Sequence, residues 1–467
     1  MKLSFHGAAR TVTGTKHLLT LENGKKYLFD CGMFQGMGAE TDTLNNDFGF
    51  NAKEIMALFL SHAHIDHSGL IPKLVKEGFT GKIYCTQATK DLAEILLYDS
   101  AEIQLNESGY TNKNNGVTNG EPVGALYNTE DVKASISLFE TIEYNEWIKV
   151  DDGAKVMYTN AGHLIGSAAI NLRVIENGKK TAITFSGDVG RYRSALLQPP
   201  AEFPQADYII LESTYGDKMH DISFSTIENL EKWIKKTCLQ RGGKLIIPAF
   251  SVGRTQEILY CLNQLELENR LPEINYFVDS PLGTKATEII KGYKDDYNER
   301  LQNILKIDSD PFLFKGLRYV ETADESKQLV DYKEPCVIIS SSGTADAGRV
   351  KHHIFSCIDG ESNTVLLSGY CQASSLGGRL LSGAQQVEIF GDTCNVKAEV
   401  GQIKSMSAHG DCDDLARFIG CQNAEKVKTV FLVHGEYLVQ QELTTRLNRK
   451  GFEKIEMPSM HQEFVLD

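Results

Sequence analysis

The sequence predicts an α/β protein in which two β-sheets stack between helices, with a second α/β domain inserted into the first. Three observations lead to this fold class. Strand-like runs alternate with helical patterns in the first part of the chain, and a five-residue segment occurs twice between such runs. The pattern then changes to longer helices and Gly/Ser loops from about residue 211.

Short apolar runs define the expected strands of the first part. The strand-like runs are HLLTL (17–21), KKYLFDCG (25–32), ALFLSHAH (57–64) and KIYCT (82–86), whereas ATKDLAEILLYDSAEIQL (88–105) has a helical pattern. Alternation of strand-like runs with helical patterns is typical of an α/β domain.

The segment ENGKK occurs at 22–26 and again at 176–180. Asn-Gly between two strand-like runs is a strong hairpin signal. Each repeat leads into a strand that ends near an aspartate and a glycine, at Asp30 and at Asp188. The repeated context predicts an internally duplicated, β-rich core with two sheets.

The middle of the chain is expected to form a separate domain. Segments such as 246–268 and 337–354 read as a strand, a glycine-containing turn and a helix, an arrangement that gathers ligands beyond the carboxyl ends of parallel strands. A histidine follows an apolar run again in KTVFLVHGE (428–436), as in the first part. We therefore expect a first domain from 1–210 and 400–467, interrupted by an inserted domain at 211–399.

Composition is that of a compact globular protein. The 467 residues are 42% hydrophobic with only 11 prolines, and no apolar run is long enough for a membrane span or a signal peptide. The ten cysteines form no regular framework, which favours reduced thiols and a cytoplasmic location. A net charge of −14 opposes indiscriminate binding to nucleic acid or anionic membranes.

The segment LSHAHIDHSG (60–69) places three histidines and an aspartate directly after an apolar run. Imidazole and carboxylate groups are ligands of zinc, manganese and iron, and four of them unpaired near a core are unfavourable. The spacing of His62, His64, Asp66 and His67 lets one pair face one ion and the second pair face a neighbouring ion. The cluster therefore predicts two metals.

Three further donors occur in comparable places. His163 lies in a loop of small residues, Asp188 at a strand end, and His434 after an apolar run. Together with residues 62–67 they make seven donors, which suits two ions. A two-metal site generates a bridging hydroxide at neutral pH and stabilises the attacking and leaving oxygens of phosphodiester cleavage.

This motif set resembles the metallo-β-lactamase-fold hydrolases. The segments LESTYGD (Glu212), SAHGD (His409) and VHGE (His434) further resemble the signature motifs of the β-CASP nucleases, which include RNase J and the endonuclease subunit of the cleavage and polyadenylation specificity factor. The resemblance spans nearly the whole chain. It implies an αββα metallo-β-lactamase sandwich with an inserted α/β β-CASP domain.

The resemblance also implies a role for each residue of the site. One zinc would be held by His62, His64 and His163, the other by Asp66, His67 and His434, and Asp188 would bridge them. Asp30 would fix the orientation of a ligand imidazole. His409 would protonate the leaving oxygen or hold a phosphate oxygen, and Glu212 would orient the His409 imidazole. Asp66 would be a catalytic residue as well as a metal ligand. Without the family resemblance, the sequence around Glu212 favours a carboxylate that caps a helix or forms an ion pair.

The family pattern favours RNA over DNA, because a histidine at 434 accompanies RNA-processing members whereas the DNA-repair branch typically has valine. Two inserted-domain loops would contact phosphates of a single strand through Arg254, Ser341, Ser342, Gly343 and Arg349. Glycine turns that pack strand against helix explain these loops equally well. Thr344 and the single Gly348 depart from the pattern of bacterial relatives, which leaves the nucleotide contacts open.

The function that follows is zinc-dependent hydrolysis of single-stranded RNA, as an endonuclease, a 5′ exonuclease or both, with manganese or iron as alternative metals. The family also makes a homodimer one expected assembly. The alternatives are hydrolysis of a small thioester or lactone and a non-catalytic subunit. A non-catalytic relative generally loses ligands, and this chain keeps all seven. A flavin-linked di-iron reductase usually has glutamate where His64 stands.

Overall fold

The computed structural model describes residues 1–114, 124–220, 226–369 and 371–467. By their internal contacts, these residues form two compact units. The first is Met1–Met219 together with His409–Asp467, and the second is His220–Ala408. Strand β11 (Tyr208–Glu212) pairs within the first unit and β19 (Glu399–Gln402) within the second, so each junction lies slightly later in the chain than 211 and 399.

The first unit contains two seven-stranded sheets, and this confirms the predicted fold class. The first sheet has the order β22-β1-β2-β3-β4-β5-β6, with strands β1 (Lys2–Phe5), β2 (His17–Thr20), β3 (Lys26–Phe29), β4 (Ile55–Phe59), β5 (Lys82–Cys85), β6 (Phe139–Thr141) and β22 (Glu463–Val465). The second has the order β21-β20-β11-β10-β9-β8-β7, with β7 (Ile148–Asp151), β8 (Ala154–Asn160), β9 (Ala168–Glu176), β10 (Lys179–Phe185), β11, β20 (Thr429–Val433) and β21 (Ile455–Glu456).

Alternating burial along the strands explains the layering. In β11, Tyr208 and Ile210 join the core between the two sheets, while Ile209 and Leu211 join a second core on the outer face. Successive side chains of a strand point to opposite faces, so a strand covered on both faces is apolar throughout. The outer core is completed by apolar residues of helices α13 (Cys412–Phe418) and α14 (Tyr437–Asn448).

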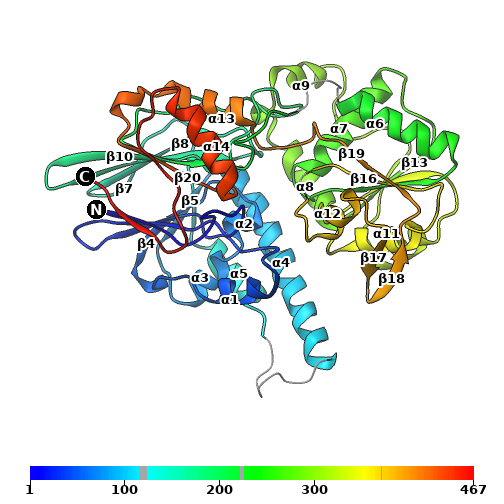
Figure 1. Cartoon of the computed structure of the whole chain (residues 1–467), viewed down its shortest axis with the longest axis horizontal. Helices are drawn as coiled ribbons and strands as arrows, with labels where there is room; N and C mark the ends of the chain where they lie inside the picture. Colours follow the sequence, from blue (N-terminus) through cyan, green and yellow to red (C-terminus); the bar gives the residue numbers. More distant parts are fainter. Residues whose placement is uncertain (115–123, 221–225, 370) are drawn as a thin grey trace. The chain divides into compact units, whose positions relative to one another are not determined.

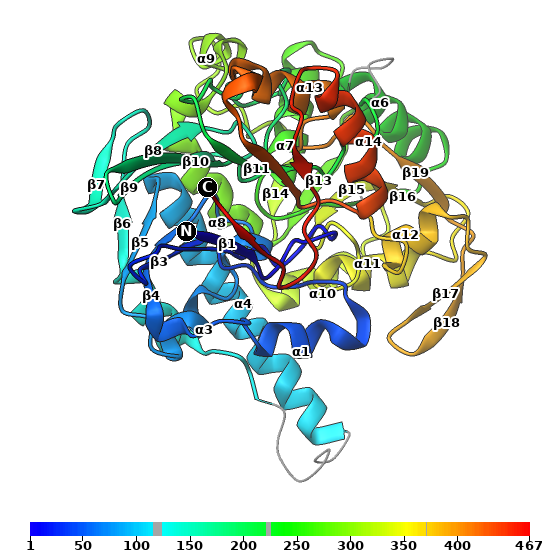
Figure 2. The same cartoon turned by 60° about the vertical axis from the view of Figure 1, so that its left-hand side comes forward.

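The remaining helices of this unit pack beside the first sheet (Figure 1). They are α1 (Thr41–Asn46), α2 (Ile65–Ser68), α3 (Ile71–Lys76), α4 (Gln87–Asn114) and α5 (Thr129–Ile136). Figures 1 and 2 show α4 running past its neighbours. The two termini lie side by side, because β22 pairs with β1 and the Leu466 amide donates to the Met1 carbonyl at 3.0 Å.

Both ENGKK segments form the expected turns. The first connects the antiparallel strands β2 and β3, and the second connects β9 and β10. Asn177 and Gly178 have φ angles of 49° and 77°, the left-handed pair that a two-residue hairpin turn requires. Each hairpin then delivers an aspartate, Asp30 or Asp188, to the end of its second strand.

The second unit is built on a six-stranded parallel sheet of order β14-β13-β15-β12-β16-β19. Its strands, in addition to β19, are β12 (Lys244–Pro248), β13 (Asn275–Asp279), β14 (Leu317–Tyr319), β15 (Cys336–Ser340) and β16 (Thr364–Leu367), and β17 (Gln386–Ile389) and β18 (Asp392–Asn395) form a separate hairpin. Its helices are α6 (Thr226–Ile234), α7 (Arg254–Leu267), α8 (Pro281–Lys291), α9 (Glu299–Ile304), α10 (Ala323–Val330), α11 (Arg349–Cys357) and α12 (Leu376–Leu381). Among the described residues, no helix has both the length and the apolar character to cross a membrane.

Candidate metal centre

The histidine-rich segment lies at the carboxyl end of β4, within the first unit. β4 ends at Phe59, and α2 begins at Ile65. His62 and His67 are fully buried at 0% and 1% exposure, and His64 is the residue that precedes α2. The Nε2 atom of His62 lies 3.1 Å from Nδ1 of His64, so this turn brings its imidazoles together as the spacing predicts.

The second sheet supplies three more donors from the ends of its strands. His163 follows β8, Asp188 follows β10 and His434 follows β20, and all three are at most 4% exposed. Strand β11 lies between β10 and β20, and the three are parallel. Their carboxyl ends therefore meet at one edge, which places Asp188, Glu212 and His434 near one another.

The seven predicted donors converge into two adjoining clusters. His62, His64, His163 and Asp188 form one, and Asp66, His67 and His434 form the other. Within each cluster, one donor atom from every residue lies within 4.8 Å of the others. Asp188 faces both, with Oδ2 at 3.6 Å from His62 Nε2 and Oδ1 at 3.3 Å from His67 Nε2.

The environment keeps most of these groups in the protonation state that a metal ligand needs. Burial lowers the pKa of His62 and of His163 well below the ordinary value, so both imidazoles are neutral. Burial alone raises the pKa of Asp188, but the surrounding imidazoles of His434 and His67 outweigh it and hold that pKa well below its usual range. Neutral imidazoles and an ionised carboxylate are the metal-binding forms.

Two residues outside the clusters orient the imidazoles. Asp30 is fully buried, accepts hydrogen bonds from the Ser61 amide and hydroxyl at 2.7 Å, and lies 2.6 Å from Nδ1 of His67. Thr214 Oγ1 lies 3.0 Å from Nδ1 of His434. Each contact occupies one ring nitrogen and leaves the other, Nε2, facing the cluster.

His409 lies beside the clusters and contacts Glu212. Its Nδ1 is 3.0 Å from Glu212 Oε1, and its Nε2 is 3.8 Å from Asp188 Oδ2. Glu212 is fully buried and also accepts hydrogen bonds from the amides of Val189 and Thr214, at 2.9 and 3.0 Å. Burial lowers the pKa of His409, but the carboxylates of Glu212 and Asp188 outweigh this effect and raise it to about 9.

The residues of the centre fit bound metal. Asp188 Oδ1 is buried and has no hydrogen-bond partner within the described parts of the chain. The Nε2 atoms of His67 and His434 face each other at 3.4 Å, and Nε2 of His67 lies 3.3 Å from Asp188 Oδ1, so a cation among these atoms would be contacted by all three. A set of imidazole nitrogens and carboxylate oxygens suits zinc, and also manganese or iron.

The five predicted phosphate-contacting residues lie in the second unit. Arg254, Ser341, Ser342, Gly343 and Arg349 follow β12 or β15, which are adjacent parallel strands. Both arginines already form ion pairs or hydrogen bonds within that unit. Arg254 pairs with Glu257, whereas Arg349 donates to Asp279 at 2.7 Å and to the carbonyls of Val320 and Glu321.

Several residues of these sites were not singled out from the sequence. Ser61 precedes His62 and Thr214 lies two residues after Glu212, and their short polar side chains were the available signal. Ser251 and Ser280 form a hydroxyl chain with Ser341, with successive Oγ atoms 3.1 Å apart. Their proximity depends on the pairing of β13 with β15, which no local pattern encodes.

Three family models match the chain in succession. The model of the metallo-beta-lactamase superfamily matches residues 17–133, and that of the Beta-Casp domain matches residues 255–380. A model described as a Zn-dependent metallo-hydrolase RNA specificity domain matches residues 393–458. The first match lies in the first unit and the second match lies in the second unit. The third begins in the second unit and continues into residues 409–458 of the first.

Related proteins match over almost the whole chain. Ribonuclease TTHA0252 of Thermus thermophilus is 34% identical over 93% of both chains, and an RNase J-like protein of Methanocaldococcus jannaschii is 31% identical over 93% of this chain and 92% of that one. Transcription termination factor FttA of the same archaeon is 29% identical over 93% of this chain and 67% of its own length. The chain therefore belongs to the β-CASP family of metallo-β-lactamase-fold hydrolases and is a metal-dependent hydrolase.

Proposed function

We propose that this protein hydrolyses phosphodiester bonds of single-stranded RNA at a centre of two zinc ions. One observation carries the proposal: the seven donors form two adjoining clusters, Asp188 of the first also faces the second, and a protonatable histidine, His409, lies beside Asp188. Two ions side by side are the arrangement suited to in-line displacement at phosphorus. RNA is the proposed substrate because two relatives are named as ribonuclease and RNase J-like protein.

We assign His62, His64 and His163 to one ion, and Asp66, His67 and His434 to the other, with Asp188 between them. When bound, the ions supply Lewis acidity and lower the pKa of the attacking water. The protein positions the ligands: Asp30 holds His67, and Thr214 holds His434, each through Nδ1.

His409 is the proposed general acid. Its Nδ1 is occupied by Glu212, so the proton to be transferred is held at Nε2, the nitrogen nearest to Asp188. A pKa raised to about 9 keeps the imidazole protonated at neutral pH. When the phosphorus–oxygen bond breaks, this proton passes to the leaving oxygen, and Glu212 stabilises the imidazolium before transfer.

The test is cleavage of end-labelled RNA and of DNA of the same sequence by purified protein with its metal content measured. We expect metal-dependent cleavage of RNA, little cleavage of DNA, and loss of cleavage in His64→Ala. His352→Ala is the matched control, because His352 is an exposed histidine of the second unit that stacks on Phe390. The fragment ladder separates internal cuts from 5′ end digestion.

Absence of RNA cleavage by protein that binds two zinc ions would refute the proposed substrate. Hydrolysis of thioester or lactone substrates by the same sample would then support the small-molecule alternative. The homodimer and the cytoplasmic location stay predictions from the sequence.

A further inference from the structure

A buried lysine, Lys16, is joined to the backbone of the second donor cluster. This cluster consists of Asp66, His67 and His434. Lys16 is 0% exposed, and its Nζ donates to the carbonyls of Gly14 and Gly32 at 2.9 and 3.0 Å. The Nζ atom also lies 4.2 Å from the centroid of the Phe34 ring. Within the described parts of the chain no carboxylate pairs with this ammonium, so two carbonyls and an aromatic face replace its water.

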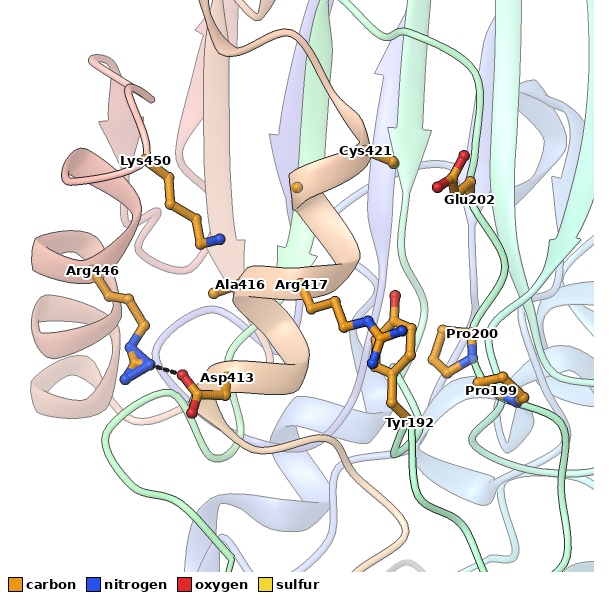
Figure 3. Close-up of a pocket in the computed structure, with 11 residues that line it drawn as sticks. Tyr192, Pro199, Pro200, Glu202, Asp413, Ala416, Arg417, Cys421, Arg446 and Lys450 are labelled. Carbon is orange, nitrogen blue, oxygen red and sulfur yellow. Dashed lines mark hydrogen bonds and ion pairs between the residues drawn. The ribbon is translucent and has the colours of Figure 1, made fainter.

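The ammonium of Lys16 differs from a surface cation. Figure 3 shows Arg417 face to face with Tyr192 beside a surface pocket, where the arginine is exposed. A buried ammonium without a carboxylate partner costs free energy, because its hydration is lost and no ion pair replaces it. A methionine would fill the same space without that cost. The hydrogen bonds of the ammonium therefore contribute something that an apolar side chain of this length cannot.

The segments that the lysine joins hold the backbone of Asp66 and His67. The amide of Thr15, the residue before the lysine, donates to the Asp66 carbonyl at 2.8 Å. The amide of Cys31, the residue before Gly32, donates to the His67 carbonyl at 2.8 Å. Gly32 also packs against the peptide bond between the two donors, because a Cβ there would lie 1.7 Å from the Asp66 carbonyl oxygen.

His434 is linked to the same ammonium through the loop that follows β1. The amide of His434 donates to the Ala8 carbonyl at 2.7 Å. The preceding residue is Gly7, and a Cβ there would lie 1.6 Å from the Gly14 carbonyl oxygen and 3.3 Å from Lys16 Nζ. The backbone that holds His434 therefore packs directly against the hydrogen bond from Lys16 to Gly14.

The contacts of Lys16 thus converge on the backbone of the whole second cluster. In the first cluster, by contrast, the amide of His163 donates to Oγ of Ser167, 3.0 Å away. Both of these residues lie outside the segments that Lys16 joins. The lysine therefore distinguishes between the two candidate metal sites.

We propose that Lys16 is a positioning residue for the ion of the second cluster. Its ammonium fixes the backbone to which Asp66, His67 and His434 are hydrogen-bonded, so the three donors are already in place when metal binds. Partners that orient metal ligands in this way raise metal affinity. The inference rests on the proposed two-zinc centre and assigns to that centre a residue that acts on one ion only.

The experiment measures zinc binding to the metal-free, full-length protein by competition with a chromophoric chelator. Lys16→Met removes the ammonium and keeps the length of the side chain. We expect one ion to bind as in the wild type and the other to bind about 10–100-fold more weakly. The matched control is Lys73→Met. Lys73 is 4% exposed and its Nζ lies 4.2 Å from the Phe48 ring, but it donates to the Asn46 carbonyl and pairs with Glu77.

Two further backgrounds identify the weakened site. His163→Ala disrupts the first cluster, and His434→Ala disrupts the second. In the His163→Ala background, Lys16→Met should weaken the ion that remains by the same factor as in the wild type. In the His434→Ala background it should add little, because the site that depends on the lysine is already lost.

Wild-type affinity for both ions in Lys16→Met would overturn the inference. Equal weakening of the remaining ion in the two histidine backgrounds would also overturn it, because the lysine would then not act on one site. Equal loss of zinc affinity in Lys73→Met would assign the effect to general destabilisation of the first unit.

Hydrogen exchange of the metal-free wild type tests the inference without any variant having to fold. The amides of Thr15, Cys31 and His434 should exchange slowly before zinc is added, because the lysine already holds this backbone. Fast exchange of all three until zinc binds would show that the metal orders the backbone. A wild-type protein that binds two zinc ions and cleaves no RNA would refute the proposed function and leave this inference standing, whereas one that binds no zinc would overturn both.

Discussion

Asp30→Asn tests how the fold prepares a ligand imidazole. Asp30 accepts three hydrogen bonds: Oδ1 takes the Ser61 amide at 2.7 Å, while Oδ2 takes the Ser61 hydroxyl at 2.7 Å and Nδ1–H of His67 at 2.6 Å. Asparagine fits the space and tolerates the φ of 56° at this position. It differs in having one oxygen acceptor and one NH₂ donor.

The amide group has two orientations, and each is unfavourable. With its nitrogen at the place of Oδ2, the ring of His67 must accept at Nδ1 and carry its proton at Nε2, the atom that faces Asp188 and His434. A protonated Nε2 cannot bind metal. With the nitrogen at the place of Oδ1, two donors meet at the Ser61 amide, and a buried unsatisfied donor costs about 1–3 kcal/mol.

We therefore expect Asp30→Asn to weaken zinc binding by about 10–100-fold, which corresponds to about 1.4–2.7 kcal/mol. The assay is competition with a chromophoric zinc chelator, and RNA cleavage should recover as free zinc is raised. The matched control is Asp279→Asn in the second unit. Asp279 is equally buried and also lies 2.6 Å from a histidine, His353, but it is remote in sequence from every predicted ligand.

The control should lose stability and keep wild-type zinc affinity. If Asp30→Asn bound zinc as tightly as the wild type, Asp30 would not set the tautomer of His67. If Asp279→Asn lost zinc affinity to the same extent, the effect would come from general destabilisation.

Three further predictions concern His409, the strandedness of the RNA, and Arg349. His409→Ala should keep both zinc ions and lose about 10²–10⁴-fold in turnover, and a normal cleavage rate with full metal content would exclude His409 as the acid. Single-stranded RNA should be cleaved and a duplex of the same sequence should not. The reason is that the predicted donors His62 and His67 are at most 1% exposed, and the phosphodiester bond to be cleaved must reach them. Equal rates on both substrates would contradict this prediction. Arg349→Ala should destabilise the protein to urea at pH 7 by about 2–3 kcal/mol, because it removes a partner of the buried Asp279. Burial raises the pKa of Asp279, but His353, Ser326 and Arg349 outweigh it and lower that pKa, so the stabilisation is present above the ordinary carboxyl pKa and is lost as the pH falls through the folded-state value. The difference between variant and wild type should therefore shrink at acid pH, and a difference that is constant down to the lowest pH would contradict the assignment.

The sequence predicted the features that depend on local pattern. The αββα arrangement followed from strand runs and from the two Asn-Gly turns, in which Gly24 and Gly178 both have a positive φ, a local property of glycine. The donors could be collected because each follows the end of a strand, and the ends of neighbouring strands meet at one edge of a sheet.

Contacts between distant segments could not be predicted in the same way. Thr214 reaches His434 only because β11 pairs in parallel with β20, more than two hundred residues later. The phosphate contact of Arg349 stays a prediction, whereas the hydrogen bonds from its guanidinium to Asp279 and two carbonyls could not be predicted, because they depend on where β13 and the following segments lie. The acceptors that an arginine finds are set by tertiary structure, whereas the sequence shows only that the arginine follows a glycine turn.

We propose that RNA hydrolysis by this protein depends on two ions held by the seven donors. It is tested most directly by adding zinc stepwise to metal-free protein while bound zinc and RNA cleavage are measured in the same samples. We predict that cleavage returns as two zinc ions bind per chain and that His64→Ala fails to recover. Cleavage without bound metal, or two bound zinc ions with no cleavage of any RNA, would show that hydrolysis does not depend on these ions.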